Sequence, residues 1–157
     1  MNESPTRAPA EARRRGLLII LGAQAFSLVL FFALTYVVRP EASADGNHTL
    51  TWALGAVGFT TFLASFLIKR KLLTQAVAEH RPDLGTTAFV IAFAMCEMTA
   101  LLGFVAYLIT GLSYALHSFI IAAAGLLLHF PARGAFDRIE AGGDGSGGNA
   151  NLNKTAL

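Results

Sequence analysis

Four apolar runs, separated by short polar segments, divide the chain along its length. They predict helices at about residues 16–38, 50–80, 86–110 and 113–130. An α-helix rises about 1.5 Å per residue, so roughly 20 apolar residues cross the hydrocarbon core of a bilayer. The second run ends at Lys69, but Leu73 and Val77 keep a helical spacing that extends this helix beyond the membrane. The pattern predicts an all-α fold, a four-helix transmembrane bundle.

The first run has two possible interpretations. Basic residues precede it and Ala42-Ser43-Ala44 resembles a cleavage site, which would make it a signal peptide. Its length of about 23 residues exceeds the 7–15 usual for that purpose, which favours a retained helix. We therefore expect a basic cytoplasmic tail at 1–15, a membrane domain at 16–131 and a flexible cytoplasmic tail at 132–157.

The positive charges predict the orientation of the bundle. All but one of the 12 lysines and arginines lie in the amino tail, the segment between the second and third runs, or the carboxyl tail. The exception is Arg39, after the first run. Because lysine and arginine accumulate on the cytoplasmic side, both termini should be cytoplasmic. The expected location is a bacterial-type inner membrane, crossed several times.

The composition excludes several classes of protein. With 54% hydrophobic and 14% charged residues, the chain is typical of membrane proteins. Cys96 is the only cysteine, so no internal disulfide can form. The basic residues follow the membrane boundaries and form no continuous patch, so the expected partner is the bilayer and not nucleic acid. No nucleotide-binding, dinucleotide-binding or zinc-protease motif occurs, and no cofactor is expected.

Two histidines lie in the fourth run. His117 and His129 are about 12 residues apart, a spacing found in paired haem ligands on one helix. Haem also needs facing ligands, and no other histidine lies in an apolar run. Interfacial or hydrogen-bonding roles are therefore favoured over haem or metal binding.

Glu97 is the one charged residue inside the apolar runs. A carboxylate at membrane depth is costly and marks a functional site by default. The small residues Ala94 and Ala100 flank it and leave room for a neighbouring helix or chain. Glu97 could bind an ion, or it could be a protonated side chain that hydrogen-bonds a neighbouring Thr, Ser or carbonyl and holds helices together.

The sequence around Glu97, with Ala100 and Gly103 after it, resembles the carboxyl-side helix of rotary ATP synthase subunit c. The preceding helix contains Gly55, Ala56 and Gly58 and leads to a polar turn at Arg81-Pro82-Asp83, which resembles the rest of that hairpin. The resemblance covers about 60 residues. It implies that Glu97 is the proton- or sodium-binding carboxylate. We expect Ala94, Ala100 and Gly103 to form its supporting face.

Small residues also recur in the fourth run. Ser118, Ala122 and Gly125 form a seam typical of helix packing, within the bundle or between copies of the chain.

The favoured function is an ion-handling or energy-coupling membrane subunit that uses Glu97. The alternative is a non-catalytic accessory or assembly subunit, and an enzyme ranks third because one carboxylate lacks convergent partners. The partners expected are further copies of the chain or other membrane subunits.

Overall fold

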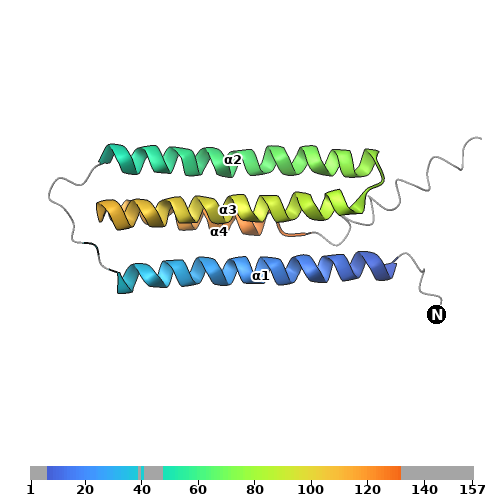
Figure 1. Cartoon of the computed structure of the whole chain (residues 1–157), viewed down its shortest axis with the longest axis horizontal. Helices are drawn as coiled ribbons and strands as arrows, with labels where there is room; N and C mark the ends of the chain where they lie inside the picture. Colours follow the sequence, from blue (N-terminus) through green and yellow to red (C-terminus); the bar gives the residue numbers. More distant parts are fainter. Residues whose placement is uncertain (1–6, 39, 41–47, 132–157) are drawn as a thin grey trace, which may run out of the picture.

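The computed structural model describes residues 7–38, 40 and 48–131, with side chains from residue 11 onward. Within these residues every regular element is helical (Figure 1). The elements are α1 (Arg7–Val37), α2 (His48–Ala78), α3 (Pro82–Thr110), the 3-10 turn η1 (Ser113–Leu116) and α4 (His117–Leu128). The all-α prediction is confirmed for this part of the chain. The carboxyl tail predicted at 132–157 lies outside it.

Three of the helices are long and apolar enough to cross a membrane. The spans are Glu11–Val37 within α1, all of α2 and all of α3. A fourth apolar helix, Ser113–Leu128, comprises η1 and α4 and is shorter. The chain is a helical membrane protein with three candidate spans and one shorter helix beside them.

The third helix, α3, lies between α1 and α2, and α4 packs alongside it (Figure 1). Burial follows this arrangement. In the apolar 18-residue stretch of each helix, the buried share is 44% for α3, 17% for α2 and 11% for α1. The buried side chains of α3 include Phe89, Phe93 and Cys96. Outward-facing residues such as Phe26 on α1 are exposed, as expected for side chains surrounded by lipid.

Helix α1 begins at Arg7, well before residue 16, where the apolar run starts. The intervening residues are rich in alanine and arginine, which are strong helix formers. Pro9 falls in the first turn, where its missing N–H removes no intrahelical hydrogen bond. The basic residues from Arg7 onward are therefore helical and continuous with the first apolar run.

The turn between α2 and α3 is shorter than the sequence pattern predicts. α3 begins at Pro82 and not at 86, because proline is well suited to the first helical position. His80 adopts a left-handed φ of 52°, and the Arg81 N–H donates to the Ala76 carbonyl at 2.9 Å, closing the end of α2. α2 and α3 therefore form a tight antiparallel hairpin.

Candidate functional site

A hydrogen bond joins α1 to α3 in the middle of both helices. The Ser27 hydroxyl donates to Glu97 Oε1 at 2.6 Å, and both side chains are half-buried. Ion pairs among the described residues include Glu11–Arg15, Glu79–Arg81 and Asp83–Arg81. None of them includes Glu97, so this carboxyl group has a neutral hydroxyl partner from another helix.

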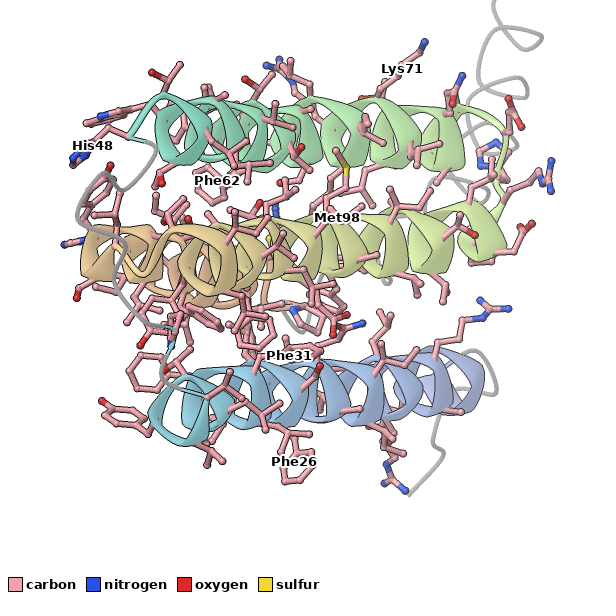
Figure 2. The ribbon with its side chains drawn as sticks, turned by 60° about the vertical axis from the view of Figure 1, so that its left-hand side comes forward. Phe26, Phe31, His48, Phe62, Lys71 and Met98 are labelled. Atoms are coloured by element: carbon pink, nitrogen blue, oxygen red, sulfur yellow. The ribbon has the colours of Figure 1, made fainter. Side chains whose placement is uncertain are left out.

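One face of α1 positions Ser27 toward α3. Leu28 is buried, and the Phe31 ring lies 5.8 Å from the Phe104 ring of α3, centroid to centroid. Figure 2 shows Phe31 pointing from α1 toward α3, whereas Phe26 points away. Side chains three and four residues apart share a helix face, so Ser27 and Phe31 lie on one face of α1.

Gln24 precedes Ser27 by one turn on this same face, and the sequence reasoning missed it. Its Oε1 is buried and has no hydrogen-bond partner among the described residues. A buried oxygen without a hydrogen-bond donor lowers the stability of the fold by roughly 1–3 kcal/mol. A hydrogen donor or a cation bound at this oxygen would remove that cost. The available signal was an amide inside an otherwise apolar run, although a neutral amide stands out less than a carboxylate.

The three small residues expected to support Glu97 do not share one environment. Ala94 is exposed, whereas Ala100 and Gly103 are buried. A Cβ added to Gly103 would lie 2.7 Å from Ser118 Oγ and 2.8 Å from the Ala115 carbonyl oxygen. Gly103 follows Glu97 by about one and two-thirds turns, so it faces η1 and α4 while Glu97 faces α1.

The small-residue seam of α4 lies inside the bundle. Ser118 packs against Gly103, and Ala122 is fully buried. A Cβ added to Gly125 would lie 2.6 Å from Cys96 Sγ and 2.9 Å from Phe62 Cε2. The seam therefore packs against α3 and α2, which lets α4 approach both helices closely.

A second polar group lies where α4 ends. His129 is fully buried, and its Nε2 lies 2.9 Å from Ser65 Oγ of α2. Lys69 Nζ lies 3.4 Å from His129 Nδ1 and 3.4 Å from the His129 carbonyl oxygen. An ammonium group can only donate, so Nδ1 accepts and Nε2–H donates to Ser65, whose hydroxyl then donates to the Phe62 carbonyl at 2.6 Å.

This group gives His129 a hydrogen-bonding role, as the sequence favoured, and gives Lys69 an inward contact that the sequence pattern did not predict. The lysine marks the end of the apolar run, yet its side chain lies over the Phe89 ring at 4.3 Å from the centroid. His117 lies at the opposite end of α4 from this group and is exposed. Its Nδ1 donates to the Tyr114 carbonyl at 2.7 Å. In the described part of the chain, no group of three or more His, Cys, Asp or Glu side chains is placed to hold a metal ion.

Comparisons with known proteins add no relative. No protein-family model, curated protein or solved structure matches the chain. The resemblance to rotary ATP synthase subunit c therefore rests on the sequence of the hairpin around Glu97 alone. The features of the chain itself define a helical membrane protein with a carboxyl–hydroxyl contact in its middle.

Proposed function

We propose that this protein is a small ion-handling or energy-coupling membrane subunit in which Glu97 takes up and releases a proton or a sodium ion. The observation that supports it is the Ser27–Glu97 hydrogen bond, one turn from the unpartnered oxygen of Gln24. These side chains offer oxygen atoms in an apolar setting and no competing cation. Oxygen donors suit hard cations such as sodium, and a protonated carboxyl could supply a hydrogen to an unsatisfied acceptor.

The surroundings of Glu97 support reversible binding. Glu97 is half-buried and not enclosed, because α1 is the least buried of the three long helices. A basic partner would hold the carboxylate permanently ionised, whereas the hydroxyl of Ser27 can pair with either form. The site therefore keeps both its loaded and its empty state accessible, as a transport or coupling step requires.

The same hydrogen bond favours a second candidate function, that of an accessory or assembly subunit. Ser27 and Glu97 are 70 residues apart in the chain and connect α1 to α3. Interhelical hydrogen bonds in membranes contribute about 0.6 kcal/mol on average. In this case Glu97 would stabilise the position of α1 and would not exchange an ion.

Reaction with dicyclohexylcarbodiimide tests ion binding directly. Protonated carboxyl groups add to this apolar reagent, so we expect Glu97 to be labelled in preference to the exposed carboxylates Glu11 and Glu79. Labelling should fall as the pH rises, because fewer carboxyl groups carry a proton. If sodium is the ion, sodium chloride should suppress labelling and potassium chloride at equal ionic strength should not. Mass spectrometry of the digested protein measures each site separately.

Two results would contradict the ion-binding proposal. One is a Glu97 that stays unlabelled while Glu11 and Glu79 react. The other is labelling of Glu97 that depends on neither pH nor sodium over the range in which the protein stays folded. The exposed carboxylates serve as internal controls for reagent quality and digestion.

The proposed orientation places both termini and the α2–α3 turn in the cytoplasm. It rests on the concentration of lysine and arginine in alternate segments. Reporter fusions after Ala78 and at the carboxyl end are expected to report cytoplasm, and a fusion after residue 46 the opposite side. A periplasmic signal from the fusion after Ala78 would overturn this orientation.

A further inference from the structure

A groove of about 660 Å³ lies along α2, beside the end of α4. It lies where α4 has ended at Leu128 and α2 continues to the turn before α3 (Figure 1). Its walls are largely apolar and include Phe66, Leu73, Val77 and Leu128. Polar atoms come from Lys69, Arg70, Thr74 and His129. An apolar groove therefore has two cations along one edge.

Neither cation has an acidic partner among the described residues. The carboxylates nearest in the chain, Glu79 and Asp83, pair with Arg81 at 3.8 Å and 2.7 Å. Lys69 is held in place by His129 and by the Phe89 ring, both of which are uncharged in this arrangement. The groove thus presents positive charge that no anion of the described chain neutralises.

The position of the groove indicates where an anion would come from. Lys69 and Arg70 follow the apolar run of α2, so we expect them at the level where a bilayer changes from hydrocarbon to headgroups. Basic pockets between transmembrane helices at this level bind anionic headgroups. The groove combines such charges with apolar walls that suit an acyl chain.

We propose that this groove binds an anionic phospholipid. The phosphate lies between Lys69 and Arg70, and an acyl chain packs against Phe66 and Leu128. This site is separate from Glu97 and does not depend on ion binding there. Lys71 provides a matched comparison, because it carries the same charge on the same turn but does not line the groove. Figure 2 shows its side chain pointing away from α3.

Native mass spectrometry of the full chain in mild detergent tests the site, with phosphatidylglycerol and phosphatidylcholine of matched acyl chains as probes. The expected result is preferential retention of phosphatidylglycerol. Arg70→Gln should reduce that preference about fivefold, since one basic residue near anionic lipid contributes about 1 kcal/mol. Lys69→Gln should do the same, and Lys71→Gln should leave the preference unchanged. Arg70 is exposed, so its variant should fold even if loss of Lys69 disturbs His129.

Three outcomes would overturn the proposal. Equal retention of the two lipids would show that the phosphate charge is not recognised. Equal losses in Arg70→Gln and Lys71→Gln would show a diffuse effect of net charge. Displacement of phosphatidylglycerol by inorganic phosphate in the buffer would show a site for a soluble anion and not for a lipid.

Discussion

Replacing Gly103 with alanine is expected to lower the free energy of unfolding by roughly 1–3 kcal/mol, the usual effect of overpacking. The added Cβ would lie 2.7 Å from Ser118 Oγ and 2.8 Å from the Ala115 carbonyl oxygen. The Ser118 hydroxyl can rotate away from such a contact. Ser118 Cβ, which the added atom would also meet, and the Ala115 carbonyl oxygen are both fixed by the backbone. The start of α4 would therefore have to move away from α3. Unfolding of the purified protein in mild detergent, by heat or by a denaturing detergent, measures the change.

Two other glycines provide controls for this prediction. A Cβ at Gly55 of α2 would meet nothing within 4 Å, so Gly55→Ala should be neutral or slightly stabilising because alanine favours helix. A Cβ at Gly125 would contact the side chains of Cys96 and Phe62, which can shift, so Gly125→Ala should have an intermediate effect. Equal stabilities of the Gly103→Ala and Gly55→Ala variants would contradict the close approach of α4 to α3.

The number and type of the helices could be predicted from the sequence because these properties are local. Hydrophobic length determines whether a segment can cross a membrane, and it can be measured without knowing the neighbours of the segment. The ends of the helices were harder to predict. Proline occurs both in loops and at the first position of a helix, where the missing N–H removes no intrahelical hydrogen bond. The sequence alone did not show which of the two applies to Pro82.

The candidate site was only partly predictable, for a different reason. Glu97 stands out in the sequence because a charge in an apolar run is costly. Its partner Ser27 does not, since the pairing depends on which helix lies beside α3 and on how far each helix is rotated about its axis. Gln24 shares this limitation, because its importance appears only when its oxygen is seen to be buried without a donor.

Lys69 illustrates how a charged residue can serve two purposes. In the sequence it marks the end of the apolar run, and in the structure it lies near the end of α4. Its aliphatic chain also lets the ammonium group turn inward over Phe89 and reach His129, as long basic side chains often do. The end of the apolar run is visible in the sequence, but the contact requires the end of α4 to lie against α2.

Replacement of Glu97 by glutamine is expected to abolish the function of the protein in its host while leaving its fold intact. Glutamine keeps the size of the side chain and an oxygen that accepts from Ser27, but it cannot release a proton or carry a negative charge. Thermal unfolding in mild detergent should therefore be close to that of the unmodified chain. Complementation of a strain that lacks the protein should fail.

The variants Glu97→Ala and Ser27→Ala distinguish ion binding by Glu97 from a purely structural role. The alanine at 97 leaves the Ser27 hydroxyl without its acceptor, so it should destabilise the bundle, by up to about 1.7 kcal/mol for a membrane hydrogen bond. Ser27→Ala removes the same hydrogen bond and keeps the carboxyl group. If Glu97 binds an ion, function should be lost in Glu97→Gln despite normal stability, and Ser27→Ala should retain some of it. Full function in Glu97→Gln, together with matched losses of stability and function in the two alanine variants, would instead establish Glu97 as the acceptor that holds α1 against α3.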